Sequence, residues 1–134
     1  MTLFLDTNII IDLIEFTREE HQTAVNLLNS ILKNKYQIVI SEDMLTTIFY
    51  LAKKDKLKAL KFLDVIQKKW KIVTFGRTII KNAINISLKN NLDLEDVLQC
   101  LCAKNHQCDT IITNDKYFYD CGIKIQTASE FLNA

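Results

Sequence analysis

The sequence contains no proline and only two glycines, Gly76 and Gly122, among its 134 residues. Phosphate-binding loops of the Walker and dinucleotide-binding types need several closely spaced glycines, so neither motif can be written on this chain. Long apolar runs are also lacking, because stretches such as residues 9–11 fall far short of the roughly 20 residues that span a bilayer. These absences exclude the common nucleotide-binding loops and predict a protein without a membrane span.

The N-terminus and the charge distribution restrict the class of protein further. The first five residues carry no basic side chain and Asp6 interrupts their apolar stretch, which argues against a signal peptide and predicts a cytoplasmic location. A net charge of +1 excludes a uniformly basic surface. Eight lysines nevertheless lie between positions 53 and 71, whereas acids gather at 42–43 and 93–96. The lysine-rich segment fits a solvated helix face or an RNA-binding patch, and both interpretations stay open.

The four cysteines, Cys100, Cys102, Cys108 and Cys121, show no C-x-x-C spacing. We expect four reduced thiols, since no spacing suggests a disulfide framework and the protein is predicted to be cytoplasmic. The alternative is a zinc site formed by Cys102, His106 and Cys108, but structural zinc usually takes four ligands and no second spaced pair is present.

Short apolar segments alternate with amphipathic ones along the whole chain. Strands are expected at residues 2–5, 36–40, 72–75, 109–113 and 123–126. Helices are expected at about 18–34, 41–54, 57–70, 80–89, from 93 onward and after 127. Strands this short and apolar are typical of a sheet covered on both faces. The pattern therefore predicts one α/β domain over residues 1–134, a three-layer α/β/α fold around a central, mainly parallel sheet.

Polar residues at four positions predict where helices begin. A capping box of Thr17 and Glu20 precedes the helix at 18–34, and Ser41 is placed to cap the next one. Asp93 is expected to cap the helix that follows it, and Thr127 begins a last capping box.

Three carboxylates follow predicted strands or begin a helix beside them: Asp6, Asp96 and Asp115. Ligands of open parallel sheets bind at the carboxyl ends of the strands, so these positions are the first candidates for chemistry. Converging carboxylates repel one another unless a cation neutralises them, and Mg²⁺ or Mn²⁺ prefers such oxygen ligands. Taken singly, each residue also fits a helix cap or a turn. Their coincidence favours a metal site for phosphodiester cleavage.

Three motifs resemble the acidic signatures of the PIN domain, in the family's order: LDTN at 5–8, DLEDVLQ at 93–99 and ITNDKYF at 112–118. The resemblance runs from position 2 to about 131, and the segments at 40–50 and 125–131 resemble a bacterial subgroup of VapC-like toxins. It implies an Mg²⁺- or Mn²⁺-dependent ribonuclease of a type II toxin–antitoxin pair, with RNA as substrate and a small antitoxin protein as partner. The implied metal ligands are Asp6, Asp96 and Asp115, with Asn8 supporting Asp6 and Thr113 forming a hydrogen bond within the pocket.

The chain departs from the family pattern at one position. Most members carry an acid in the helix after the second strand, where this sequence has Thr47. Glu42 or Glu95 is the alternative fourth acid, and Tyr117 also stands where many relatives have an acid. The departure keeps a second hypothesis open, in which the protein is a catalytically degenerate PIN fold that binds RNA or protein.

Two other α/β classes share an acid after the first strand and are disfavoured. Haloacid-dehalogenase-type phosphatases need a second acid two residues later, where Asn8 stands, and receiver domains need a phosphorylated aspartate after the third strand, where Phe75 and Gly76 stand. The helices between Ser41 and Trp70 carry more apolar residues than one core-facing stripe needs, which predicts a homodimer.

Overall fold

The computed structural model describes residues 1–52 and 54–134, and its central feature is a five-stranded sheet in which all strands are parallel. The strands, in the spatial order β3-β2-β1-β4-β5, are β1 (Thr2–Leu5), β2 (Gln37–Ser41), β3 (Lys71–Val73), β4 (Thr110–Ile112) and β5 (Lys124–Gln126). The helices are α1 (Thr7–Ile14), α2 (His21–Asn34), α3 (Asp43–Leu51), α4 (Lys56–Lys69), α5 (Arg77–Asn90), α6 (Leu94–Asn105) and α7 (Ala128–Leu132).

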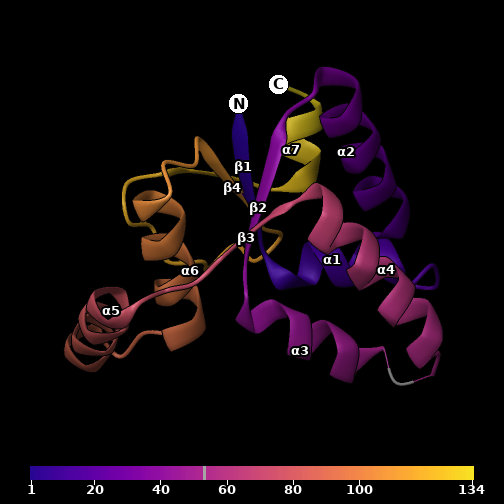
Figure 1. The fold of residues 1–134 in the computed structure, drawn as a ribbon. Coiled ribbons are helices and arrows are strands. Elements are labelled where there is room, and N and C mark those ends of the chain that lie inside the picture. Colours follow the sequence, from indigo (N-terminus) through magenta and orange to yellow (C-terminus); the bar gives the residue numbers. More distant parts are fainter. Residues whose placement is uncertain (53) are drawn as a thin grey trace.

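The sheet lies between two layers of helices. Figure 1 shows α5 and α6 on one side of the strands and α1, α2, α4 and α7 on the other. Helix α3 contacts both α1 and α4. The three-layer α/β/α prediction is therefore confirmed, and the sheet is entirely parallel among the described strands.

The middle strand, β1, brings two chain segments together at the functional edge of the sheet. Its residues Leu3, Phe4 and Leu5 are at most 1% exposed, because helices cover both faces of the strand. Burying each such side chain contributes about 1.5–3 kcal/mol to folding. Leu5 pairs with Ile112 of β4, so the residues that follow the two strands emerge side by side.

The predicted helix starts are partly right. Asp93 accepts a hydrogen bond from the Asp96 main chain, and Thr127 forms the predicted capping box at α7. The box at Thr17 is wrong, since α2 begins at His21 after a turn and its N-cap makes no side-chain bond. Ser41 is not a cap either: it ends β2 with its hydroxyl buried and unpartnered among the described residues, because the strand continues one position further than expected.

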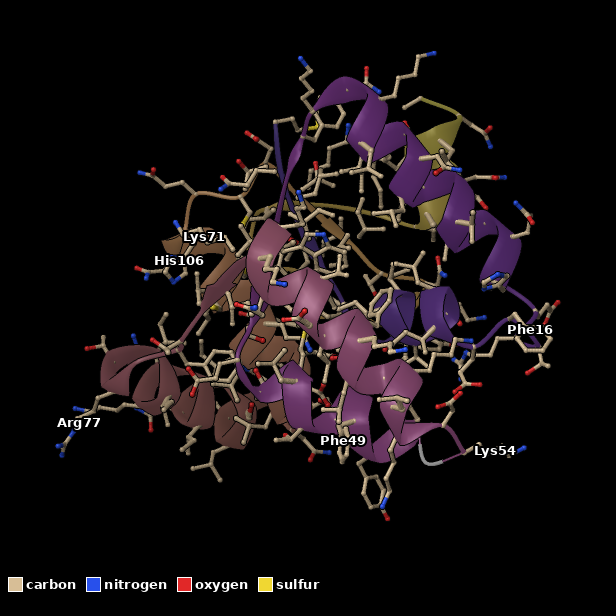
Figure 2. The ribbon with its side chains drawn as sticks, turned by 45° about the vertical axis from the view of Figure 1, so that its right-hand side comes forward. Phe16, Phe49, Lys54, Lys71, Arg77 and His106 are labelled. Atoms are coloured by element: carbon tan, nitrogen blue, oxygen red, sulfur yellow. A yellow bond between two sulfur atoms is a disulfide. The ribbon has the colours of Figure 1, made fainter. Side chains whose placement is uncertain are left out.

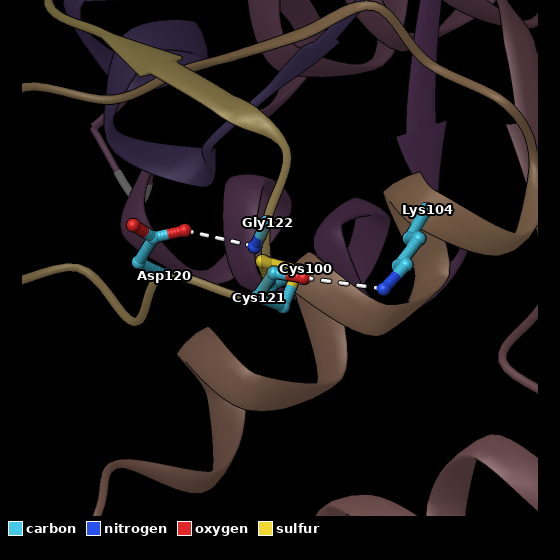
Figure 3. Close-up of a disulfide and its surroundings, with 5 residues drawn as sticks. All are labelled: Cys100, Lys104, Asp120, Cys121 and Gly122. Atoms are coloured by element: carbon cyan, nitrogen blue, oxygen red, sulfur yellow. Dashed lines mark hydrogen bonds between the residues drawn. A yellow bond between two sulfur atoms is a disulfide. The ribbon is translucent and has the colours of Figure 1, made fainter.

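The cysteine prediction is wrong for two of the four residues. Cys100 of α6 and Cys121 of the β4–β5 loop form a disulfide, with a Cα–Cα distance of 6.1 Å (Figure 3). The pair is 21 residues apart and meets only because the loop turns back over α6, which linear spacing does not reveal. Cys102 and Cys108 are free and buried, and burial raises their thiol pKa values to about 12 and about 11.

The loop around the disulfide is fastened at two further points. Lys104 of α6 donates a hydrogen bond from Nζ to the Cys121 carbonyl at 3.3 Å, and Asp120 Oδ1 accepts one from the Gly122 main chain at 2.8 Å. Gly122 has a φ of +102°, a conformation that side-chain-bearing residues rarely adopt. Helix α6 and the segment after β4 are therefore held to each other by covalent and polar contacts.

Two further expectations concern the surface. The described lysines of the α4 region are solvent-exposed, whereas Lys53, which belongs to the same predicted lysine-rich segment, lies outside the described residues. No helix within residues 1–52 or 54–134 has both the length and the apolar character needed to cross a membrane.

Candidate functional site

The Thr113 hydroxyl links two of the predicted metal ligands. It donates a hydrogen bond to Asp6 Oδ2 at 2.8 Å and accepts one from the Asp115 main chain at 3.1 Å. The arrangement follows from the sheet, because the Asp6 main chain continues the β1–β4 ladder by donating to the Ile112 carbonyl. Asp6 is only 6% exposed, and although it precedes α1 its side chain makes no helix-capping bond. The capping interpretation of Asp6 is therefore wrong.

Burial and neighbouring charge act together on the Asp6 carboxyl. Desolvation raises its pKa, and the charge of Asp115 adds to this effect. The hydrogen bond from Thr113 opposes it by stabilising the carboxylate. Asp115 is itself exposed, and its Oδ1 accepts a hydrogen bond from the Tyr117 main chain at 2.9 Å, as a turn residue does.

Asp96 lies in the first turn of α6 and faces the same acids. Its main-chain N–H donates a hydrogen bond to Asp93 Oδ1, which agrees with the expectation that Asp93 caps this helix. Its side chain is in a different situation: partial burial, then the charges of Asp93, Asp115 and Asp6, raise its pKa to about 7. A carboxylate that only stabilised a helix N-terminus would be held in its charged form. The raised pKa instead indicates a site with more negative charge than it can neutralise.

Glu95 and Gln99 form a second polar group beside Asp6. Gln99 is fully buried and donates from Nε2 to Glu95 Oε1 at 3.1 Å, and the Thr7 hydroxyl lies 3.5 Å from the same oxygen. Desolvation, and next the charge of Asp6, raise the pKa of Glu95. Gln99 Oε1 is buried without a hydrogen-bond partner in the described chain. Gln99 was not among the site residues predicted from the sequence, although its position four residues after Glu95 puts both on one helix face.

Glu42 and Asp43 are the acids at the start of α3, whereas Thr47 stands where most family members have an acid. The Thr47 side chain is exposed and its hydroxyl lies 3.5 Å from the Asp43 carbonyl, within its own helix. Glu42 borders an open cavity of about 360 Å³ near Gly76. Asp43 lies close enough to Glu95 for its charge to contribute to the raised Glu95 pKa.

Asn8 lies at the entrance of the site rather than against Asp6. It is exposed on α1 and lines a cavity together with Asp115, and within the described residues its side chain makes no hydrogen bond to Asp6. Tyr117, at the position where many relatives have an acid, is 83% exposed and supplies no carboxylate.

The donor set suits a hard divalent cation. Asp6, Glu95, Asp96 and Asp115 offer only oxygen ligands, which Mg²⁺ and Mn²⁺ prefer. Within residues 1–52 and 54–134, no three acidic, histidine or cysteine side chains are already gathered closely enough to share an ion. Cys102, His106 and Cys108, the ligands of the alternative zinc site, form no such group in the described part of the chain. Carboxylates repel one another in the absence of a cation, which agrees with the raised pKa values of Asp6, Glu95 and Asp96.

Comparison with known proteins identifies the family. The model of the PIN domain family matches residues 3–124. The chain is also 37% identical over 132 residues to Ribonuclease VapC1 of Aquifex aeolicus, covering 96% of this chain and 92% of that protein. The chain therefore belongs to the PIN domain family and, within it, to the VapC group.

Solved structures share the fold. VapBC2 of Rickettsia felis, determined bound to a DNA fragment from its promoter, matches with a TM-score of 0.71 and 22% identity over 95% of this chain and 98% of that one. A toxin–antitoxin complex from Klebsiella pneumoniae gives the same TM-score and identity over 96% and 98%. VapC20 of Mycobacterium tuberculosis, a toxin that cleaves the sarcin–ricin loop, matches with a TM-score of 0.70 and 13% identity over 90% and 91%.

Proposed function

We propose that this protein is a single-domain, Mg²⁺- or Mn²⁺-dependent endoribonuclease and the toxin of a type II toxin–antitoxin pair. The observation that carries the proposal is the Thr113 bridge between Asp6 and the Asp115 main chain, close to Asp96, on which the charges of both acids act. This constellation lies at the carboxyl ends of adjacent parallel strands, where ligands of such sheets bind. The nearly full-length similarity to a VapC ribonuclease supports the same activity.

In this proposal Asp6, Asp96 and Asp115 hold the cation. When bound, the metal ion lowers the pKa of a water molecule and stabilises negative charge on the phosphate. Thr113 keeps the Asp6 carboxylate oriented and ties it to the main chain of the Asp115 turn. The burial of Asp6 and the partial burial of Asp96 strengthen their attraction for a cation, because charges interact more strongly where water is displaced.

Glu95 is the fourth acid that the contacts favour. Thr47, at the position where most members have an acid, points its hydroxyl back into α3. The buried Gln99 donates a hydrogen bond to Glu95, and the Thr7 hydroxyl lies beside the same carboxylate oxygen. Both contacts hold the Glu95 carboxylate on the side of Thr7, the residue after Asp6. Glu42 borders another cavity, near Gly76, and within the described residues no side-chain hydrogen bond joins it to Glu95 or Asp6. We therefore assign the supporting role to Glu95 rather than to Glu42.

The partners proposed are RNA, a small antitoxin protein and a second copy of the chain, in a cytoplasmic setting. Relatives of the same fold are known in toxin–antitoxin complexes. The dimer is supported by an apolar groove of about 790 Å³ between α3 and α4, whose lining includes Leu45, Phe49, Leu60 and Leu63. Leu60 is 52% exposed there, so contact with another chain would remove apolar surface from water.

The test is cleavage of a labelled RNA by purified protein in Mn²⁺, in Mg²⁺ and in a chelator. We expect cleavage that needs the metal and that Asp115→Asn abolishes. Asp64→Asn, an exposed acid of α4 paired with Lys68, is the matched control and should cut like the parent. RNA cleavage that persists in the chelator, or in Asp115→Asn, would refute the assignment. RNA binding without any cleavage would instead favour the degenerate PIN fold, for which Thr47 is the motivation.

A further inference from the structure

An open cavity of about 430 Å³ begins at the proposed metal site and extends to the turn between α1 and α2. Asn8, Asn114 and Asp115 line the end near the site, and Asp12, Arg18, Glu19 and Glu20 line the other. Its volume lies in the range of ligand pockets. Because Asp115 lines this cavity, an RNA strand with one phosphate at Asp115 can place a neighbouring nucleotide in it.

Arg18 is the one basic residue among those that line the cavity, and it is held in place at several points. Its Nε donates to Asp12 Oδ1 at 2.6 Å, and the Asp12 side chain is only 7% exposed while that of Arg18 is 43% exposed. The Arg18 main chain donates to the Glu15 carbonyl, and its own carbonyl accepts from His21. The His21 ring also bonds to the Asp12 carbonyl at 2.7 Å.

This attachment leaves the outer edge of the guanidinium available. Only Nε is bonded to Asp12, and the two terminal nitrogens make no hydrogen bond to a residue of the described chain. A guanidinium group presents paired donors that match the oxygens of a phosphate. Because a buried carboxylate fixes the side chain, little conformational entropy is lost when the remaining donors bind a ligand.

We propose that Arg18 binds a backbone phosphate of the RNA next to the phosphate that is cleaved, and that Asp12 is its positioning residue. The inference rests on the proposed ribonuclease function and extends the substrate contacts beyond the metal site. Glu19 and Glu20 oppose the binding of a small free anion in the same cavity. A strand already bound at the acids delivers its next phosphate at high effective concentration, so a polynucleotide overcomes this repulsion where inorganic phosphate does not.

The experiment measures binding of a fluorescent single-stranded RNA in Ca²⁺ over a series of salt concentrations. Ca²⁺ takes the same oxygen ligands as Mg²⁺ with a looser geometry, so the intact acidic site can bind RNA with little cleavage. Arg18→Gln, Asp12→Asn and Arg77→Gln are each compared with the parent protein. Arg77 is the matched control: it is an exposed arginine at the start of α5, on the opposite side of the molecule from Phe16 of the α1–α2 turn (Figure 2).

We expect Arg18→Gln to weaken RNA binding about tenfold and to reduce the slope of log K against log salt by about 0.7, the value for one phosphate contact on a single strand. Asp12→Asn keeps the Arg18 charge but releases its orientation, so it should weaken RNA binding by a smaller factor and leave the slope unchanged. Arg77→Gln should change neither the affinity nor the slope. An ion pair that only fixes the turn predicts instead the same loss of thermal stability for Arg18→Gln and Asp12→Asn, with no change in slope.

The outcomes separate the two proposals. An unchanged salt slope in Arg18→Gln, or an equal reduction in Arg77→Gln, overturns the role of Arg18 even if the parent protein cleaves RNA. Absence of RNA binding by the parent in Ca²⁺, together with absence of cleavage in Mg²⁺ and Mn²⁺, overturns the ribonuclease function and this inference with it.

Discussion

Replacing Asp96 by asparagine tests whether this residue is a metal ligand or only stabilises the start of α6. The folded protein raises the pKa of Asp96 from an ordinary value of 3.8 to about 7, by burial and by neighbouring acids. Between pH 4 and pH 7 the folded protein therefore binds more protons than the unfolded chain. The free energy of unfolding must fall as the pH rises through this window. Asparagine does not titrate, so Asp96→Asn removes this loss.

The size of the effect follows from the same pKa. If solvent did not screen it at all, a carboxylate with this pKa would lower the free energy of unfolding by about 4 kcal/mol at pH 8. Asp96 is only partly buried, so solvent screening reduces the effect, and we expect Asp96→Asn to be about 1–2 kcal/mol more stable than the parent at pH 8 in a chelator. At pH 4 the two proteins should unfold alike.

Urea unfolding at pH 4 and pH 8, in chelator and in Mn²⁺, measures this difference. Mn²⁺ should stabilise the parent, because it binds the folded state, and should stabilise Asp96→Asn much less. RNA cleavage, assayed in the same preparations, should be lost in the variant. Two results would refute the reasoning: a variant that is less stable than the parent at pH 8 in chelator, or one that cuts RNA at the parent's rate.

Three other predictions follow from contacts elsewhere in the fold. Thr113→Val removes the bridge between Asp6 and Asp115, so it should lower the free energy of unfolding by about 1–3 kcal/mol and abolish most of the RNA cleavage. Thr113→Ser keeps the hydroxyl and should retain both the stability and the cleavage. Equal behaviour of the two variants in melting and cleavage assays would contradict this. Thiol titration of denatured, unreduced protein should find two thiols rather than four, and reduction should lower the free energy of unfolding by about 3 kcal/mol, from the 21-residue separation of Cys100 and Cys121. Light scattering at micromolar concentration should show a dimer and Leu60→Glu should shift it to monomer, so a parent protein that is monomeric there argues against the dimer.

Much of the site was predictable because its residues lie next to local signals. The apolar run before Asp6 and the strand before Thr113 could be recognised from sequence, and parallel strands place their carboxyl ends at one edge. The capping pattern of Asp93 located the first turn of α6, and with it Asp96. These inferences depend on period and position within a few residues, which the linear sequence contains.

Other parts of the site depend on contacts between distant segments. Glu95 is adjacent to Asp96 in sequence, yet only the packing of α6 against the start of α1 gives it a contact with Thr7. The fully buried Gln99 could not be distinguished from a surface glutamine by its place in the motif. Asp12 lies on α1, and Arg18 lies in the turn after it, at a position that the sequence had assigned to the next helix, so neither residue attracted attention.

The sequence by itself determined the α/β class and the order of the strands along the chain, because hydrophobic period and helix caps act over a few residues. The three aspartates of the candidate site were predicted from the same signals. Only the tertiary structure decided which cysteines pair, which side chains contact Glu95 and which arginine faces the cavity. Cys100 and Cys121 meet because the β4–β5 loop turns back over α6, and the spacing of the cysteines in the sequence does not predict this turn. Such contacts arise from the packing of whole helices on the sheet, which is fixed by the sum of many buried side chains rather than by any short motif.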